Sequence, residues 1–311
     1  MIKVLFLCDN KYWKRKMSRV RFHAANAILN HKNIIGAKDG PGFPGWKSVP
    51  ASIKKHSPDI IFWFKPLEMQ GFDKVSIPRV ISYNEMYNKA VTAREISQSG
   101  SDLIVCHLSN DIPHYSDLFK DRKFINLHHC INPSIFRDYK QKKVYDVLVT
   151  GVMASSIYPL RARVQGLIKA GKLSNLKTKI LRHPGYRISN VDSQVISYAK
   201  ELNKAKVVIS CSSKYKYALA KYSEIPACNS LMMADIPDER QEFFNKFIVP
   251  IDMSYSDEKI LQTIHKWVRS DKERRIRANL GRELTAARYT QAHYADRFYR
   301  SIKRYLEENK A

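Results

Sequence analysis

Short apolar runs recur along the first half of the chain, separated by intervals long enough to hold a helix. Ile2–Cys8 is apolar apart from one lysine, a pattern typical of a parallel strand that is buried on both faces. Further strands are predicted at Asp59–Phe64, Arg79–Tyr83, Asp102–His107 and Lys123–Leu127. Helices are predicted between them at Arg19–Leu29, capped by Ser18, at Ser48–His56 and at Asn88–Gln98. This alternation predicts βαβ units and a doubly wound parallel sheet.

The second half repeats the alternation after a polar segment, Asn132–Lys143. Strands are predicted at Tyr145–Thr150, Lys177–Leu181, Lys206–Ser210, Leu231–Met233 and Phe247–Pro250. Helices are predicted at Arg161–Ala170, Ser193–Asn203, Asp257–Arg269, Lys272–Ala287 and Gln291–Glu307, with a short one around Glu224. We therefore expect two α/β domains, residues 1–135 and 144–289. Ligands of such sheets bind at the carboxyl ends of the strands, so two facing sheets would form a cleft at their junction.

Length and charge narrow the class of partner. A chain of 311 residues is too long for one small core and fits two domains. It has 54 Lys and Arg against 29 Asp and Glu, a formal charge of +25, which attracts nucleic acid, anionic lipid surfaces or nucleotide diphosphates. The basic residues are spread over the whole chain, which favours a generally positive surface over a dedicated nucleic-acid arm.

The cysteines and the amino terminus indicate a cytoplasmic location. The cysteines number five and have no CxxC spacing, so we expect buried thiols in a reducing compartment. The first apolar run is too short for a signal peptide, and no stretch approaches the ~18 apolar residues of a membrane span.

Candidate binding chemistry concentrates in Lys214–Glu239, where Glu224 stands in the first turn of the predicted short helix. Because a glutamate is seldom buried without a partner, we interpret this carboxylate as a ligand-binding group. Its two acceptor oxygens suit the neighbouring hydroxyls of a ribose. The helix amides near Tyr222 and Ser223, with lysines nearby, would suit the adjacent phosphates. The alternative is a glutamate that only complements the helix dipole.

Sequence motifs from Asp146 onward form an ordered series: DVLVTG, YPLR, HPGY, SCSSKYKYALAKYSEIPACNSLMMAD and SDKERRIRANLGRELTAARYT. This series resembles the C-terminal half of the group 1 family of glycosyltransferases. The resemblance implies the GT-B fold, in which two Rossmann-like domains face each other across a cleft. It also implies that the C-terminal domain holds a nucleoside-diphosphate sugar, that the N-terminal domain holds the acceptor, and that the C-terminal helix, residues 290–308, crosses back to the N-terminal domain. The acceptor would be a glycan, glycoprotein or glycolipid, and neither a metal nor another cofactor is expected.

The resemblance suggests roles for several residues. Glu224 would accept hydrogen bonds from the donor ribose, and Lys216 or Arg161 would neutralise the departing diphosphate. Familiar family members carry a second glutamate at the position of Lys216, so the stereochemistry of transfer is left open. His183 and Tyr186 follow a predicted strand and could pack on the base. Alternatively, Arg161 is a solvated first-turn residue and His183 stabilises a turn.

An inverting reaction needs a base that deprotonates the acceptor hydroxyl, and it should come from strand ends of the N-terminal domain. Three residues are candidates: Glu85, directly after a strand, Asp9, after the first strand, and His23, on the first helix. A histidine titrates near neutral pH, and a carboxylate would serve if its pKa were raised. The alternatives are a hydrogen-bonded loop carboxylate, an N-cap and a core-facing histidine, respectively.

A second function class also fits part of the sequence. The basic run Lys14–Arg21 and the alternating Lys214–Tyr217 could belong to a non-catalytic binder of nucleotide or nucleic acid. The basic run could equally hold an acidic acceptor or an anionic membrane surface. A nucleotide donor is favoured over nucleic acid, because the strand and helix around Lys214–Tyr217 are those of a mononucleotide site. A dehydrogenase or methyltransferase is disfavoured, because no GxGxxG follows the first strand.

Overall fold

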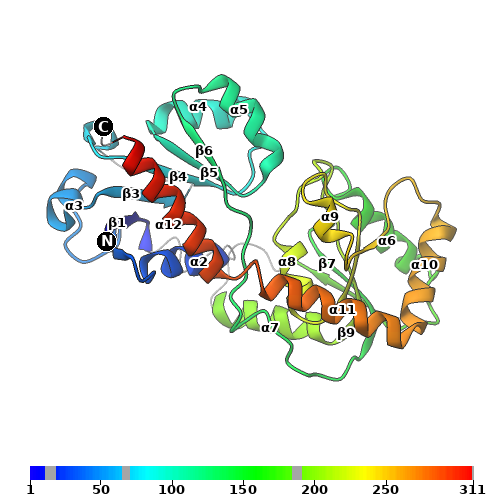
Figure 1. Ribbon diagram of the computed structural model, residues 1–311. Coiled ribbons are helices and arrows are strands. Elements are labelled where there is room, and N and C mark those ends of the chain that lie inside the picture. Colours follow the sequence, from blue (N-terminus) through cyan, green and yellow to red (C-terminus); the bar gives the residue numbers. More distant parts are fainter. Residues whose placement is uncertain (11–18, 65–70, 184–190, 310–311) are drawn as a thin grey trace. The chain divides into compact units, whose positions relative to one another are not determined.

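The computed structural model describes residues 1–10, 19–64, 71–183 and 191–309. The chain divides into two compact units (Figure 1). The first unit contains Met1–Cys130 and Gln291–Ala311, and the second contains Ile131–Tyr186 and Asp192–Thr290. The predicted cap Ser18 and most of the basic run Lys14–Arg21 lie outside the described residues.

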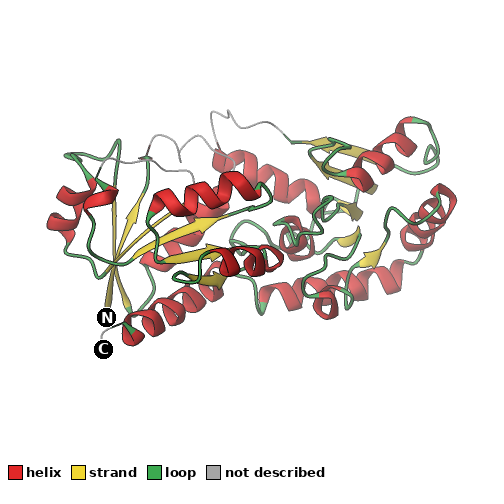
Figure 2. Ribbon diagram, turned by 90° about the horizontal axis from the view of Figure 1, so that it is seen from above, coloured by secondary structure: helices red, strands yellow, loops and turns green. Residues whose placement is uncertain are grey.

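The first unit is built on a six-stranded parallel sheet with helices on both faces (Figure 2). Its strands, in order across the sheet, are Ile34–Asp39 (β2), Ile2–Leu7 (β1), Ile60–Phe64 (β3), Arg79–Tyr83 (β4), Leu103–Cys106 (β5) and Lys123–Asn126 (β6). Its α-helices are Arg19–Leu29 (α2), Val49–His56 (α3), Lys89–Ser99 (α4), Ile112–Leu118 (α5) and Gln291–Glu308 (α12), and its 3₁₀ turns are Phe72–Lys74 and Ser109–Asp111.

Both faces of this sheet are buried, which explains the continuous apolar run of its first strand. Val4 and Phe6 pack into a core with α2 and α12, whereas Leu5 and Leu7 pack into a second core on the other face. Successive side chains of a strand point to opposite faces. A strand covered on both sides therefore needs apolar residues at every position.

The last helix, α12, belongs to the first unit and lies beside α2 (Figure 1). The ring of Phe298 packs 4.9 Å from that of Phe62, and both side chains are fully buried. Asp296 Oδ1 lies 2.9 Å from Nε2 of His31 on the chain just after α2. The expectation that the C-terminal helix returns to the N-terminal domain is confirmed.

The second unit is built on a five-stranded parallel sheet. Its strands, in order across the sheet, are Val249–Pro250 (β11), Leu231–Ala234 (β10), Ala205–Ile209 (β9), Tyr145–Gly151 (β7) and Thr178–Arg182 (β8). Its helices are Pro159–Lys169 (α6), Val191–Asn203 (α7), Lys221–Ala227 (α8), Gln241–Phe244 (α9), Asp257–Arg269 (α10) and Asp271–Ala286 (α11). Helices α6 and α10 pack into one core with β7, β9 and β10, and α8 packs against α11.

The structure contains elements that the sequence pattern did not predict: β2, α5 and the four-residue helix α9. Strand β2 lies at the edge of its sheet, and only its terminal residues Ile34 and Asp39 are buried. Its middle residues therefore lack the apolar character by which buried strands are recognised. Helix α5 is only seven residues long and has Pro113 in its first turn, so it is too short for a clear helical period.

All five cysteines are free and buried, as the sequence predicted. In the part of the chain that the structure describes, no helix has both the length and the apolar character needed to cross a membrane.

Candidate functional site

The second unit gathers its polar chemistry at the carboxyl ends of β7, β9 and β10. Strand β7 ends at Gly151, which has a positive φ of 111°. A Cβ at this position would lie 2.4 Å from Nη1 of Arg161 and 2.9 Å from Cε of Lys221. The strand end therefore requires glycine, both for its backbone conformation and because two cationic side chains crowd against it.

Arg161 is a buried cation in the first turn of α6, with only 1% of its surface exposed. Its Nη1 donates to the carbonyl of Val152 at 2.8 Å and its Nη2 to Oγ of Ser210 at 3.4 Å, while its guanidinium lies 4.3 Å from the ring centroid of Tyr158. Its Nε has no hydrogen-bond partner. Among the described residues, no carboxylate forms an ion pair with Arg161. A buried charge without a counter-ion is costly, so this site favours an incoming anion.

Lys221, the first residue of α8, is the second cation. Its Nζ lies 4.0 Å from Oε2 of Glu224 and donates to the Tyr198 hydroxyl at 3.2 Å. Burial lowers its pKa, the charge of Glu224 opposes that shift, and the charge of Arg161 adds to it. The sequence analysis counted Lys221 only among nearby lysines and gave the phosphate role to Lys216 or Arg161.

Glu224 lies beside these cations and is itself buried, with 8% of its surface exposed. Burial raises its pKa, whereas the charge of Lys221 and a side-chain hydrogen bond with Tyr198 of α7 lower it. From the sequence we reasoned that a glutamate is seldom buried without a partner and interpreted Glu224 as a ligand-binding group. The structure shows that Glu224 is buried and that Lys221 and Tyr198 are its partners.

The backbone amides at the start of α8 are already used, contrary to expectation. The amide of Tyr222 donates to the carbonyl of Leu219 at 2.9 Å, and that of Ser223 to the carbonyl of Ala220 at 3.0 Å. The Tyr222 side chain is buried and its hydroxyl donates to the carbonyl of Asp235 at 2.7 Å. Tyr222 and Ser223 therefore hold the helix in place, and their amides are not free to bind a phosphate.

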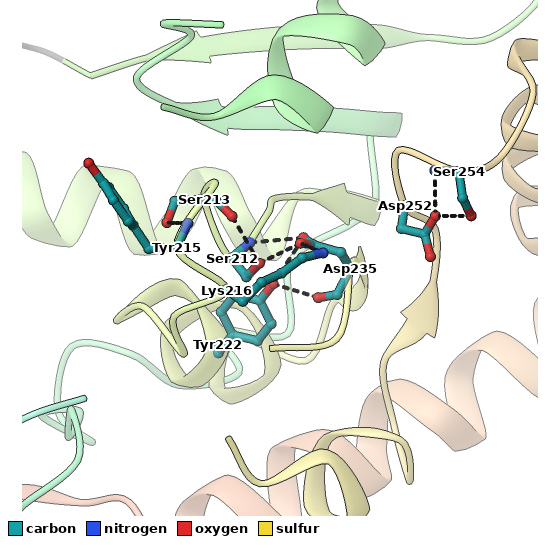
Figure 3. A network of polar contacts seen from close by, with 8 residues as sticks. All are labelled: Ser212, Ser213, Tyr215, Lys216, Tyr222, Asp235, Asp252 and Ser254. Atoms are coloured by element: carbon teal, nitrogen blue, oxygen red, sulfur yellow. Dashed lines mark hydrogen bonds and ion pairs between the residues drawn. The ribbon is translucent and has the colours of Figure 1, made fainter. Parts of the chain in front are cut away.

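Lys216 also differs from expectation, because it has a counter-ion. Its Nζ lies 3.3 Å from Oδ2 of Asp235, the residue directly after β10. The backbone amide of Ser212 donates to the other oxygen of Asp235 at 2.9 Å, and the Ser212 hydroxyl donates to Oδ2 (Figure 3). Figure 3 also shows that the ring of Tyr215 points away from Asp235. The unpaired positive charge thus belongs to Arg161 rather than Lys216.

The remaining donor-site candidates follow β8. His183 is the residue directly after this strand and is half-buried. Burial lowers its pKa, and the charge of Lys221 lowers it further, so His183 faces the same group of cations. Tyr186 lies outside the described residues.

The three candidate bases lie in the first unit. Asp9 follows β1 and Glu85 follows β4, so both stand at the carboxyl edge of the sheet, where β3 separates their strands. His23 lies within α2. All three are half-buried. Their role as a base stays a prediction.

Two other histidines lie close together at this edge, and the sequence analysis did not predict that they would be neighbours. His107 follows β5 and His129 follows β6, and their ring centroids are 4.7 Å apart. The Nε2 of His107 lies 3.1 Å from the hydroxyl of Tyr294 on α12. Burial lowers the pKa of both histidines, to about 3 for His129, and the charge of Arg21 adds to the effect. Because each histidine follows one of two adjacent strands, their proximity could have been predicted from the sequence.

A resident metal was not expected. Within the described ranges, no group of three or more His, Cys, Asp or Glu side chains could hold an ion. The expectation of a metal-independent reaction remains a prediction.

Comparison with known proteins adds to this geometry. Residues 171–300 match the family described as glycosyl transferase-like. A sucrose-phosphate synthase from Thermosynechococcus elongatus superposes with a TM-score of 0.67 over 99% of this chain and 100% of its own, at 9% identity. The chain has the GT-B fold of these structures, and its residues 171–300 are similar to glycosyltransferases. The resemblance to group 1 enzymes is thus confirmed.

Two further solved structures share the fold of this chain. A glycosyltransferase from Rickettsia africae ESF-5 superposes with a TM-score of 0.62 over 98% of both chains, at 14% identity. The HepE protein of Anabaena, in complex with UDP and glucose, superposes with a TM-score of 0.60 over 97% of this chain and 100% of its own, at 9% identity. A search of curated protein sequences finds no match.

Proposed function

We propose that this glycosyltransferase moves a sugar from a nucleoside-diphosphate sugar to a hydroxyl of a glycan, glycoprotein or glycolipid. The observation that carries the assignment of the donor site is the meeting of Arg161 and Lys221 at Gly151. Of the carboxylates that the structure describes, only Glu224 forms an ion pair with either cation. A buried and a half-buried positive charge against one negative charge suit a diphosphate.

The two cations would act on the leaving group. As the bond between the sugar and the diphosphate breaks, negative charge builds up on the departing oxygen. Arg161 is held in advance by Val152, Ser210 and the Tyr158 ring. It would therefore stabilise that charge without reorganising during the reaction. This is also why we propose that no metal ion is required.

Glu224 would hold the ribose of the donor. An ionised carboxylate accepts two hydrogen bonds, one from each ribose hydroxyl. Lys221 and Tyr198 both favour the ionised form of Glu224. We assign His183 to the neighbourhood of the base, since it follows β8 and senses the charge of Lys221.

The acceptor would bind to the first unit, with Glu85, Asp9 or His23 as the base if the reaction inverts the anomeric centre. We place the protein in the cytoplasm. Five free, buried cysteines support this location, since free thiols persist in reducing compartments.

A panel of nucleoside diphosphates and their sugars tests the proposal by thermal shift and by product release. A ligand that binds only the folded state raises Tm. We expect the nucleoside diphosphate of one particular base to raise Tm most. We also expect the protein to release nucleoside diphosphate slowly from one of the sugar nucleotides. Salt-dependent binding of single-stranded DNA without any preference among donors would instead support a non-catalytic basic binder.

A further inference from the structure

The second unit contains another concave site, at the edge of its sheet opposite Gly151. A pocket of about 670 Å³ lies where Asp138–Lys143, the segment leading into β7, meets the first turns of α11. Lys143 precedes β7, Lys206 lies at the start of β9 and Asn229 precedes β10. The pocket therefore stands at the amino ends of the strands whose carboxyl ends carry the donor site. A volume of this size fits a small molecule.

The pocket is strongly basic. Its lining has six cationic side chains and two carboxylates: Lys140, Lys142, Lys143, Lys206, Arg274 and Arg275 against Asp138 and Asp271. Both carboxylates are already occupied by protein donors. Asp138 accepts from the amide of Lys140 at 2.7 Å and from Nδ2 of Asn229 at 2.9 Å. Asp271 accepts from Arg274 and from Nε of Arg275 at 2.8 Å.

Three lysines of the lining, Lys140, Lys142 and Lys143, form no ion pair with a carboxylate among the described residues. The Nζ of Lys143 donates to the carbonyl of Asn229 at 2.8 Å and to Oγ of Ser230 at 3.0 Å, both of them neutral. Within the described part of the chain, the side chains of Lys140 and Lys142 form no hydrogen bond and no ion pair. Burial also lowers the pKa of Lys143 to about 8, and an anion in the pocket would offset that cost.

Another cation of the lining, Arg274, is held in place by several contacts. Arg274 is 5% exposed, and its Nη1 donates to the carbonyl of Val268 at 2.7 Å. Its guanidinium is further held by Asp271. The Arg274 guanidinium is therefore in place before any ligand binds, which reduces the loss of side-chain freedom on binding.

One residue of the lining has a buried acceptor that is unused. The Oε1 atom of Gln141 is buried and has no hydrogen-bond partner within the described residues. A buried acceptor left unpaired is costly. A phosphate or carboxylate cannot satisfy it, because an ionised oxygen donates no hydrogen. A ligand hydroxyl can.

We propose that this pocket binds a small organic phosphate that also bears hydroxyl groups. Its phosphoryl groups would meet Lys140, Lys142 and Lys143, and a hydroxyl would donate to Gln141. Two sources share this chemistry: a soluble sugar phosphate and the polyol headgroup of an anionic phospholipid.

Calorimetric titration with fructose 1,6-bisphosphate tests the site. The full chain is first saturated with the nucleoside diphosphate that raises its Tm most, so that the donor site is filled. We expect binding that weakens at least about tenfold in the double variant Lys140→Glu/Lys142→Glu and about threefold or more in Gln141→Leu. The matched control is Lys169→Glu/Lys172→Glu, two exposed lysines of the same unit outside the pocket, which should change affinity by less than about twofold.

Sedimentation with phosphatidylglycerol vesicles identifies the source. Vesicle binding that fructose 1,6-bisphosphate displaces, and that Lys140→Glu/Lys142→Glu abolishes, assigns a lipid headgroup. Binding of the sugar phosphate without vesicle binding assigns a soluble ligand. The proposal is overturned if neither probe binds, if the nucleoside diphosphate displaces the sugar phosphate, or if both double variants weaken binding equally.

Discussion

The Nζ atom of Lys221 lies 4.0 Å from Oε2 of Glu224, one turn along the short helix α8. Arg161 and Lys221 both lie against Gly151, and Arg161 has no carboxylate partner among the described residues. One carboxylate therefore faces two cations. The donor site is therefore electrostatically incomplete, and a diphosphate would complete it.

Replacement of Gly151 by alanine should disrupt this arrangement. The new Cβ would require a strained positive φ, at ~1–3 kcal/mol, and would push against Nη1 of Arg161, only 2.4 Å away. We expect a lower Tm and a loss of the Tm shift caused by nucleoside diphosphate. Gly171→Ala is the control, because its φ is also positive, at 73°, but its Cβ would have no neighbour within 4 Å. If both variants keep the ligand-induced shift, the crowding at Gly151 is not functional.

Glu224→Ala should abolish the Tm shift by nucleoside diphosphate and nearly all transfer, because the ribose loses its acceptor. The comparison is Glu242→Ala, a first-turn glutamate of the short helix α9 that is exposed to solvent. If Glu224 served only the helix dipole, each variant would lower stability by ~0.3–1 kcal/mol. Neither variant would then change the affinity for the donor. Donor titration by calorimetry separates these outcomes.

The pair His107 and His129 should make the first unit sensitive to acid. Both are neutral in the folded protein, with the pKa of His129 lowered to about 3. Below about pH 6.5 the unfolded chain binds protons that the folded chain does not, so stability should fall as pH falls. Urea unfolding at pH 7.5 and 5.5 measures this. The double variant His107→Gln/His129→Gln should reduce the pH dependence, whereas His114→Gln, at an exposed position, should not.

Phe298→Ala tests the attachment of α12. The side chain is fully buried against Phe62, and its removal should cost ~3–5 kcal/mol. Leu118→Ala, in the same unit but 56% exposed, should change the free energy of unfolding by less than ~0.5 kcal/mol. Equal effects in chemical denaturation would mean that α12 is not part of the first core.

Much of the fold could be predicted from the sequence, because a parallel strand that is buried on both faces has a continuous run of apolar residues. The bounds of β4 and α10 agree with the predicted ranges at both ends. Strand β2 could not be found in this way, because an edge strand needs few buried residues. The short α5 lacks the length over which a helical period becomes visible.

The site was only partly predictable, because sequence does not show which charges are paired. Lys214 and Lys216 precede α8 and Lys221 begins it. The sequence alone did not show which of the three lysines was free to bind a phosphate. Its counter-ion Asp235 comes from the end of another strand. The burial of Arg161 likewise depends on its packing against Gly151 and Tyr158, so it had the same sequence signature as an exposed first-turn arginine.

The central claim is that Arg161 and Lys221 bind the diphosphate, and calorimetry tests it most directly by comparing a nucleoside diphosphate with its nucleoside. The control is Arg163→Met, two residues along α6, whose Nε pairs with Asp257 at 2.7 Å. In the wild type and this control, the diphosphate should bind at least ~100-fold more tightly than the nucleoside, as expected for several charge-assisted hydrogen bonds. In Arg161→Met/Lys221→Met that ratio should fall below about tenfold. An unchanged ratio would contradict the account.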